Sequence, residues 1–398
     1  MLIELHMLQN FPPSNLNRDD IGQPKDCEFG GYRRARISSQ CIKRATRLHP
    51  LFAQHTGVPP SLRTKLVFTK LTDALVETHQ RSRDDARRVA VAFARQYSGK
   101  LDEKDKNKEK TAALLYLSEE EIRRTAEQLH AEWDGALAET QAAEEAPPTE
   151  NRRGRRKETG DGVMSKIVKE LIRETQDRTA APDIALFGRM LADKPETNID
   201  AACQVAHALS THPVTRMEID YFTAVDDVRE DPGAGFLDIA YFNSACFYRY
   251  SCIDWKQLVS NLDKNEALAR KTVEAYLRAS EAAIPSGKKN STAPQCRPSL
   301  MLAVVRQPQS VAWSLVNAFA RPVSGKRGGI VEESAQRMAA YFDGMHTFYG
   351  STSIKVLSLA ARPHEIDVAQ LPEVLRNAHQ GTLDTWVGTV TSTLPGVA

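Results

Sequence analysis

The sequence has no apolar run near the roughly 20 residues that span a bilayer, and no basic segment or small-residue cleavage site flanks its opening MLIELHML. We therefore expect a first strand there, with no signal peptide and no contact with a membrane. The six cysteines form no C-x-x-C pair. Without an export signal they are typical of reduced thiols in a cytoplasmic protein, and no zinc site is expected.

Familiar catalytic motifs are also missing. The sequence contains no G-x-S-x-G, H-E-x-x-H or G-x-x-x-x-G-K-[ST]. His207 and His212 lie five residues apart, which does not place them on one face, so core or surface histidines are favoured over catalytic bases. Asp226 and Asp227 lack a third metal ligand. We expect no catalytic residue, no metal and no cofactor.

Negative charge is absent from one long stretch. The chain carries 53 Lys and Arg against 51 Asp and Glu, yet residues 29–72 contain nine Lys or Arg and no acid. The net charge of +2 gives no global reason to expect nucleic acid. A role in nucleic-acid binding must therefore rest on this local distribution.

The acid-free stretch contains a short predicted helix, 39–48, which begins after Ser38 and Ser39 as N-cap candidates. Its apolar residues fall on one face, which predicts packing on a sheet. The residues at spacing i, i+3, i+4 and i+7 share the other face, and they are Gln40, Lys43, Arg44 and Arg47. Like charges at this spacing cost a few tenths of a kcal/mol per pair, so an external anion is expected to offset them.

The start of this helix adds to the argument. Free backbone N–H groups, two serine hydroxyls and the helix dipole favour anions there, and Arg33, Arg34 and Arg36 approach from the preceding strand. Arginine and lysine at such a place suit a row of phosphates. The alternative is that the basic face pairs with acids of the same chain, namely Asp19, Asp20 or Asp226. The charge pattern favours phosphates.

The chain length favours two domains, or one domain with a large insertion. Residues 61–137 show helical spacing, with a capping box at Ser118 and Glu121. The segment 141–162 is rich in Pro, Gly and charge, which predicts a disordered linker. Its RRGRRK is interpreted as a solvated tether, with nucleic-acid contact as the alternative.

The remaining elements follow one pattern. Apolar periodicity predicts strands over 2–8, 200–210, 239–253, 299–307 and 353–360, and helices over 264–283, 312–320 and 332–347. Together with the helix 39–48, they give strand, helix, strand, strand, helix, strand. This is the split βαβ pattern of a ferredoxin-like α+β sheet, here with a helical block inserted.

Three further segments carry open alternatives. In 212–235, Phe222 follows Tyr221 and either wedges between bases or packs in a core. The basic loops GKRGG (325–329) and SGKKN (286–290), the latter with Lys288 and Lys289, are phosphate contacts or solvated turns.

Several blocks resemble one known family. LNRDDIGQPKDCEFGGYRRARISSQCIKRATR, then DIALFGRM (183–190), AHALSTH (206–212) and IDYFTAVDD (219–227) occur in the order seen in the CasC-type backbone subunit of the type I-E CRISPR Cascade complex, a member of the RAMP superfamily. The resemblance covers nearly the whole chain and is weakest at 60–180 and at the C-terminus. Tyr32 stands where a basic residue is expected, and Tyr221 where a tryptophan is expected.

The resemblance implies a hand-like architecture. A palm with a modified RNA-recognition (ferredoxin-like) fold would comprise residues 1–59 and 181–398, with helical fingers at 60–180 and a thumb hairpin at about 212–240. It implies RNA contacts through the family's helix and its lead-in, that is Arg18, Lys25, Ser38, Gln40, Lys43, Arg44 and Arg47. It also implies that Phe222 and Thr223 of the thumb displace a guide base, and that Met190 packs against the displaced stretch.

The function implied is a non-catalytic scaffold that polymerises head to tail along CRISPR RNA. Its partners would be CRISPR RNA, target DNA through the guide, copies of itself, and Cascade subunits of the CasA, CasB, CasD and CasE types. One alternative is an endoribonuclease that uses His207, His212 or Asp226. Another is a sequence-specific DNA-binding factor that uses residues 38–48 as a recognition helix.

Overall fold

The structure is a computed structural model, and it describes residues 1–107, 109–145, 162–191, 194–214, 218–222, 238–326 and 328–395, without the side chains of residues 221, 222 and 238. The chain divides into two compact units. The sheet unit comprises Met1–Gly57, Cys203–Lys256 and Glu266–Ala398; the helical unit comprises Val58–Ala202 and Gln257–Asn265. None of the described helices is long and apolar enough to cross a bilayer.

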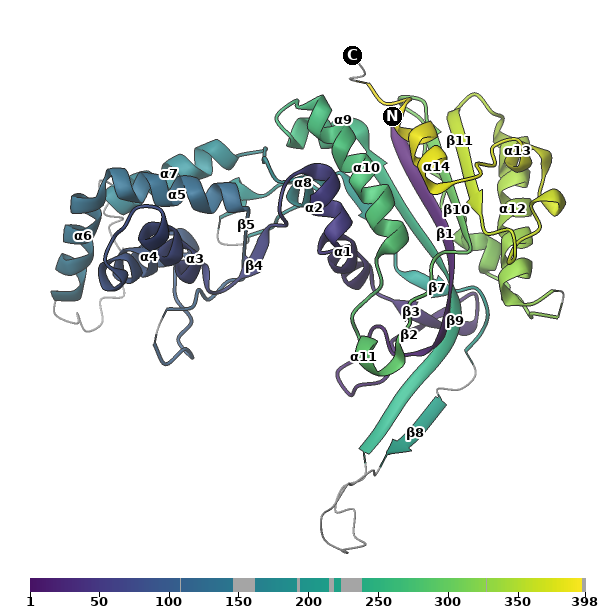
Figure 1. The fold of residues 1–398 in the computed structure, drawn as a ribbon, viewed down its shortest axis with the longest axis horizontal. Helices are drawn as coiled ribbons and strands as arrows, with labels where there is room; N and C mark the ends of the chain where they lie inside the picture. The colour runs from purple at the N-terminus through teal and green to yellow at the C-terminus, as the bar shows by residue number, and fades with distance from the viewer. Residues whose placement is uncertain are drawn as a thin grey trace, which may run out of the picture. The chain divides into compact units, whose positions relative to one another are not determined.

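The sheet unit is built on an antiparallel sheet (Figure 1) with the order β11-β10-β1-β9-β7-β3-β2. Two short strands, β6 and β8, also pair with β9. The strands are β1 (Leu2–Ser14), β2 (Asp26–Phe29), β3 (Tyr32–Ile37), β6 (Cys203–Val205), β7 (Ala208–Ser210), β8 (Glu218–Phe222), β9 (Asp238–Asp254), β10 (Leu300–Arg306) and β11 (Ile354–Ala361).

Helices cover both faces of this sheet. They are α1 (Ser39–Arg47), α2 (Pro50–Thr56), α10 (Glu266–Ala282), α11 (Lys289–Thr292), α12 (Ile330–Tyr349), α13 (Glu373–Arg376) and α14 (Leu383–Thr391), and α9 (Trp255–Asn261) leads into the helical unit. Leu8, Tyr248 and Leu302 pack towards α12, whereas Phe11 and Phe247 pack towards α1, which contacts α10. Burial on both faces explains why most residues of the central strands are apolar.

The central strands have the predicted ferredoxin-like order, β10-β1-β9-β7. The connection from β1 through α1 to β7 passes over β9, and the connection from β9 through α10 to β10 passes over β1. Both are split βαβ units, so the predicted fold class is confirmed. The helical unit is inserted between α2 and β6. It runs to Ala202, further than the range 60–180 taken from the sequence.

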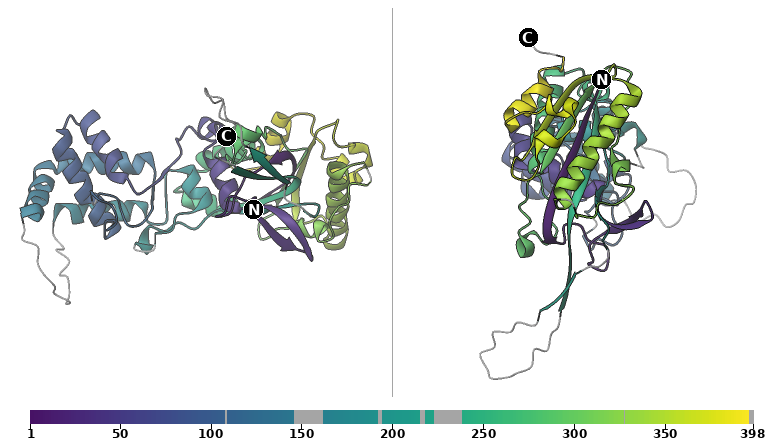
Figure 2. Two further views of the ribbon diagram at one scale, coloured as in Figure 1. Left: turned by 90° about the horizontal axis from the view of Figure 1, so that it is seen from below. Right: turned by 90° about the vertical axis from the view of Figure 1, so that its right-hand side faces the viewer.

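Two hairpins extend from the sheet. The β8–β9 arms pair from Glu218 with Phe242 to Phe222 with Asp238 and project beyond the other strands (Figure 2). The β2–β3 hairpin closes through Gly30 and Gly31, whose φ values of +63° and +78° suit a two-residue turn that only glycine adopts easily. A Cβ atom on Gly30 would lie 2.1 Å from the carbonyl oxygen of Ala320. The backbone there packs too closely for any side chain.

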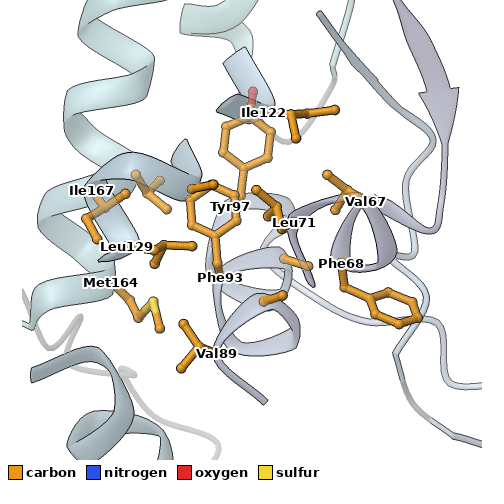
Figure 3. Packing of buried hydrophobic residues seen from close by; sticks show 14 of the residues in the cluster. Val67, Phe68, Leu71, Val89, Phe93, Tyr97, Ile122, Leu129, Met164 and Ile167 are labelled. Atoms are coloured by element: carbon orange, nitrogen blue, oxygen red, sulfur yellow. The ribbon is translucent and has the colours of Figure 1, made fainter. Parts of the chain in front are cut away.

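The helical unit has its own core (Figure 3). Val67, Leu71, Phe93, Leu129 and Ile167 are among the buried residues that its helices contribute. Its elements are β4 (Leu62–Thr64), α3 (Val67–Glu77), α4 (Arg83–Ser98), β5 (Leu115–Leu117), α5 (Glu119–Ala131), α6 (Trp133–Glu145), α7 (Val163–Thr175), α8 (Pro182–Phe187) and a 3₁₀ turn, Pro195–Thr197. The predicted capping box of Ser118 and Glu121 is present at the start of α5.

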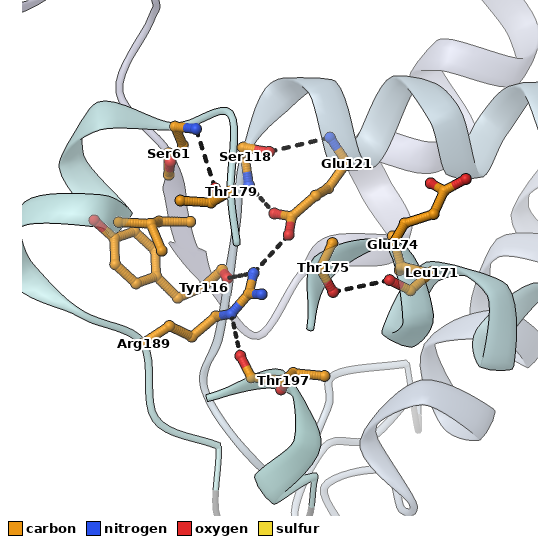
Figure 4. A network of polar contacts seen from close by, with 12 residues as sticks. Ser61, Tyr116, Ser118, Glu121, Leu171, Glu174, Thr175, Thr179, Arg189 and Thr197 are labelled. Atoms are coloured by element: carbon orange, nitrogen blue, oxygen red, sulfur yellow. Dashed lines mark hydrogen bonds and ion pairs between the residues drawn. The ribbon is translucent and has the colours of Figure 1, made fainter. Parts of the chain in front are cut away.

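A buried ion pair joins the start of α5 to the chain after α8 (Figure 4). The Nη1 atom of Arg189 lies 2.6 Å from Oε1 of Glu121, and its Nε donates to the carbonyl of Thr197 at 2.9 Å. Both charged side chains are buried. This pair fixes the backbone immediately before Met190.

The predicted strand over 200–210 forms as two short strands, and the reason is a bulge. Val205 pairs with Ser251 of β9, but Leu209 pairs with Tyr248, so one extra residue lies between β6 and β7. Bulges re-aim side chains. Here the bulge includes His207, which faces the start of α1.

The predicted helix over 312–320 is wrong. Only the 3₁₀ helix Val316–Phe319 forms, because buried side chains of the sheet take the backbone N–H groups of this segment. The N–H of Trp313 donates to Glu4 at 2.6 Å, and the N–H of Leu315 donates to the hydroxyl of Tyr248 at 2.9 Å. Glu4 also accepts two hydrogen bonds from Arg306, at 2.7 and 3.0 Å.

Two sequence boundaries also change. β1 runs to Ser14, six residues beyond the strand 2–8 predicted from the sequence. α6 runs to Glu145, which makes the first residues of the expected linker 141–162 helical; residues 146–161 lie outside the described residues.

Candidate nucleic-acid interface

The start of α1 is built by capping. Ser38 accepts a hydrogen bond from the backbone N–H of Cys41 at 3.3 Å, as the sequence predicts. The N–H of Ser39 donates to Nδ1 of His207 at 2.9 Å, and the N–H of Ser38 donates to Oδ1 of Asn17 at 2.8 Å. The protein therefore satisfies the backbone N–H groups of Ser38 and Ser39 itself, so these two groups are not available to phosphates. The hydroxyl of Ser38 accepts from Cys41 but keeps its own proton to donate, so the contact of Ser38 with RNA stays a prediction.

The helix exposes only part of the predicted cationic face. Gln40 and Arg44 are exposed, and Lys43 is half-buried with contacts of its own. Arg47 is only 9% exposed. Because α1 packs against α10 and the chain turns into α2 three residues later, the last turn of α1 is covered. Arg47 is therefore largely packed in the fold, and its contact with RNA stays a prediction.

The structure corrects the prediction that Arg34 contacts a phosphate. It is fully buried, and its guanidinium donates to the carbonyls of Ser210 at 3.1 Å and Phe319 at 2.6 Å. Burial lowers the pKa of Arg34 below its ordinary value, and the ring of Phe29 lies 5.9 Å from its charge. This arginine holds β3 to the last residue of η2 (Val316–Phe319). It has no exposed surface with which to contact a phosphate.

A loop before β2 lies against the start of α1. The N–H of Lys25 donates to the carbonyl of Asn17, and the N–H of Arg36 donates to the carbonyl of Lys25, both at 2.9 Å. The Nε atom of Arg36 donates to the backbone of Asp26. These bonds place Arg18, Lys25 and Arg36 beside the first turn of α1.

A third segment completes the surface. The loop between α10 and β10 contains Lys288 and Lys289, both exposed. A Cβ atom on Gly287 would lie 2.4 Å from the carbonyl oxygen of Leu16, so this loop packs directly on the chain before Arg18. We call the residues contributed by the three segments the basic surface; they are Arg18, Lys25, Arg36, Lys43, Arg44, Lys288 and Lys289.

Two histidines beside this surface, His207 and His49, have lowered pKa values. Partial burial, with the charges of Arg36 and Lys25, lowers the pKa of His207. Partial burial, with the charges of Arg297 and Lys289, lowers the pKa of His49. Burial is the larger cause of both shifts, and the charges of the nearby cations act in the same direction on either side of α1.

Acids of the chain do not neutralise this potential within the parts that the structure describes. There, no carboxylate lies within 4.0 Å of the charged groups of Arg18, Lys25, Arg44, Lys288 or Lys289. Asp19 accepts hydrogen bonds from the N–H groups of Ile21 and Gln23 instead. Asp226, the third candidate partner, lies outside the described residues.

The two candidate histidine bases are engaged in the fold. Nδ1 of His212 lies 3.1 Å from the carbonyl of Pro213, and its Nε2 accepts from the N–H of Cys246 at 3.3 Å. His207 accepts through Nδ1, so its other nitrogen carries a proton. Neither ring has a free lone pair to receive a proton from a substrate. No cluster of three metal-ligating side chains occurs among the described residues.

The remaining predicted residues belong to other parts of the chain. Met190 is 84% exposed and follows the buried Arg189 of the helical unit. Phe222 is the last residue of β8, and its side chain is not described; Thr223 lies outside the described residues. The roles of Met190, Phe222 and Thr223 stay predictions.

Sequence analysis missed Asn17, which positions the start of α1 by accepting from the N–H of Ser38. An asparagine in a turn gives no signal of that role in the sequence.

The solved structures that this chain resembles belong to CRISPR RNA-guided surveillance complexes. The chain matches a subunit of a "CRISPR RNA-guided surveillance complex, pre-nicking" with a TM-score of 0.79 and 29% identity, covering 98% of this chain and 99% of that one. A second match, to a "CRISPR RNA-guided surveillance complex", has a TM-score of 0.71 and 24% identity over 98% and 99% of the two chains.

A match to a protein-family model gives the family of the chain. Residues 3–388 match the model described as CT1975-like protein, and the chain belongs to this family. A search of curated proteins finds no match.

Proposed function

We propose that this chain is the non-catalytic backbone subunit of a CRISPR surveillance complex of type I-E, and that it binds the guide RNA through the basic surface. Copies assemble head to tail along the RNA and present its bases for pairing with target DNA. Subunits of the CasA, CasB, CasD and CasE types complete the assembly. The observation that carries the proposal is a surface of cations in a chain that matches such complexes over almost its whole length. Among the described residues, five of these cations have no carboxylate within 4.0 Å of their charged groups, namely Arg18, Lys25, Arg44, Lys288 and Lys289.

The chemistry of the surface fits a guide of any sequence. Lysine and arginine side chains contact phosphates, which carry no base identity. Pairing of the exposed bases then reads the target, as in other RNA-guided systems. A scaffold of this kind needs no nucleophile and no base, which agrees with the engaged nitrogens of His207 and His212.

The test compares two RNAs of equal length and unrelated sequence. We expect Kd values that agree within about threefold at each salt concentration, with equal slopes of log K against log salt. The RNA recovered after incubation with Mg²⁺ should be intact on a denaturing gel. RNA returned cut, with cutting lost in Asp226→Ala, would instead establish the endoribonuclease. A strong preference for one sequence or for duplex DNA would establish a sequence-specific factor.

A further inference from the structure

Arg249 of β9 is a buried arginine that the RNA-binding role does not use directly. It is 6% exposed, and burial lowers the pKa of its guanidinium to about 10. Among the described residues no carboxylate lies within 4.0 Å of its guanidinium, although the charge of Glu281 partly opposes the lowering of its pKa, and its Nε has no hydrogen-bond partner. A buried charge without a directly paired counter-charge is costly. Such a residue calls for a structural reason.

Its hydrogen bonds provide that reason. Nη2 donates to the carbonyl of Ser280, near the end of α10, at 3.0 Å. Nη1 donates to the side-chain oxygen of Gln9 at 2.5 Å, and the amide nitrogen of Gln9 donates to the carbonyl of Cys296 at 2.7 Å. Ser280 and Cys296 flank the loop that carries Lys288 and Lys289. Arg249 and Gln9 therefore fasten both ends of this loop to the central strands.

The loop needs such fastening. Lys288 and Ala293, at the two ends of α11, have backbone φ values of +47° and +43°. Residues other than glycine adopt such values only at a cost in conformational free energy. A four-residue helix has too few hydrogen bonds to impose this conformation alone. The surrounding contacts must hold it, and these include the close approach of Gly287 to Leu16.

Gln9 and Arg249 also lie beneath the buried face of α1. A cavity of about 10 Å³, the space of one water molecule, is lined by Gln9 and Arg249. Ile42 and Ala45 of α1 and Ala283 and Pro285 of the loop line it too. Shortening Arg249 would enlarge the gap beneath both the helix and the loop.

We propose that Arg249, with Gln9, is a positioning residue for guide RNA: it holds the Lys288–Lys289 loop beside α1 so that both contact one backbone. This inference rests on the proposed function. Arg249 contacts no RNA itself. It acts through the two lysines, whose placement depends on its hydrogen bonds.

The test is a double-mutant cycle on RNA affinity. Lys288→Ala with Lys289→Ala should weaken binding about tenfold at 0.15 M salt and reduce the salt slope by about 1.4, because two phosphate contacts are lost. Arg249→Met should cause a loss of similar size. Adding it to the lysine pair should cause little further loss, since the lysines are already absent. Effects that multiply to about 100-fold would overturn the proposal.

Two variants separate fastening from other effects. Arg249→Lys keeps the charge but replaces the two separate donor nitrogens, Nη1 and Nη2, by one nitrogen on a shorter side chain. It should bind RNA more weakly than wild type, and wild-type binding by this variant would overturn the proposal. Gln9→Leu frees the Cys296 end of the loop and should act in the same direction. It decides the question if Arg249→Met does not fold, because unchanged RNA affinity in Gln9→Leu would contradict the inference.

A control for stability uses Ser358→Ala on β11, which removes a buried hydrogen bond to the carbonyl of Trp386. It should lower Tm without changing RNA affinity. If Arg249→Met behaves like this control, Arg249 only stabilises the fold and the inference fails. Failure of wild-type protein to bind RNA would instead reject the proposed function, so the two results are distinguishable.

Discussion

Replacing Lys25 and Arg44 together by glutamate is expected to weaken RNA binding on the order of 100-fold at 0.15 M salt, because two phosphate contacts are lost and two repulsive charges are added. The two side chains belong to one site. Burial raises the pKa of Cys41, and the charges of Arg44 and Lys25 both oppose that shift, so both lie near this thiol. Titration of labelled RNA at several salt concentrations measures the effect.

The matched control is Lys355→Glu with Arg376→Glu, which changes the net charge by the same amount. These residues lie on β11 and α13. β11 ends the sheet order on the side away from β3, the strand that leads into α1. Their cations donate to the carbonyls of Thr393 and Ala369. We expect the control to reduce RNA affinity several-fold at most. Equal losses in both variants would mean that only total charge matters, which contradicts a localised basic surface.

Arg306→Met is expected to destabilise the sheet unit by about 3–5 kcal/mol, because it leaves the carboxylate of Glu4 buried without its ionic partner. Both side chains are fully buried, and Trp313 stacks on the guanidinium at 3.9 Å. The double variant Glu4→Met with Arg306→Met should recover part of this loss, since no unpaired charge remains, although the N–H of Trp313 loses its acceptor. Thermal unfolding at pH 7 measures both.

The pH dependence of this pair has a definite sign. Burial opposes ionisation of Glu4, but the nearby ring of His6 and the hydrogen bonds from Arg306 outweigh it and hold the pKa of Glu4 below the ordinary value. The pair therefore stabilises the protein above the unfolded pKa of about 4.3, and this contribution is lost as the pH falls through the lower folded pKa. In Arg306→Met, burial raises the pKa of Glu4 instead. The Tm difference from wild type should shrink from pH 7 to pH 4.5; a constant difference would contradict the ionic account.

The topology of the sheet could be predicted from the sequence because apolar residues recur along each central strand and turn residues or helical spacing separate one strand from the next. The start of α1 could be predicted because Ser38 has a local capping signature. Residues 312–320 also have helical spacing, but distant partners, Glu4 and Tyr248, decide their conformation. No local pattern records such contacts.

The same limit applies to the site. Arg34 and Arg36 look alike in the sequence, yet one is buried against the carbonyls of Ser210 and Phe319 and the other lies half-exposed beside α1. The charge pattern located α1 and the Lys288–Lys289 loop separately. Their packing through Gly287 against Leu16 is a tertiary contact, and only the structure shows that they form one surface.

Size-exclusion chromatography with light scattering tests the central claim most directly. Purified protein is run alone and with guide RNAs of two lengths, at low and high salt. We expect a species whose mass increases with RNA length by whole subunits, contains intact RNA, and dissociates as salt rises. A protein whose mass is the same with and without RNA at low salt would contradict the account of a scaffold that assembles along its guide.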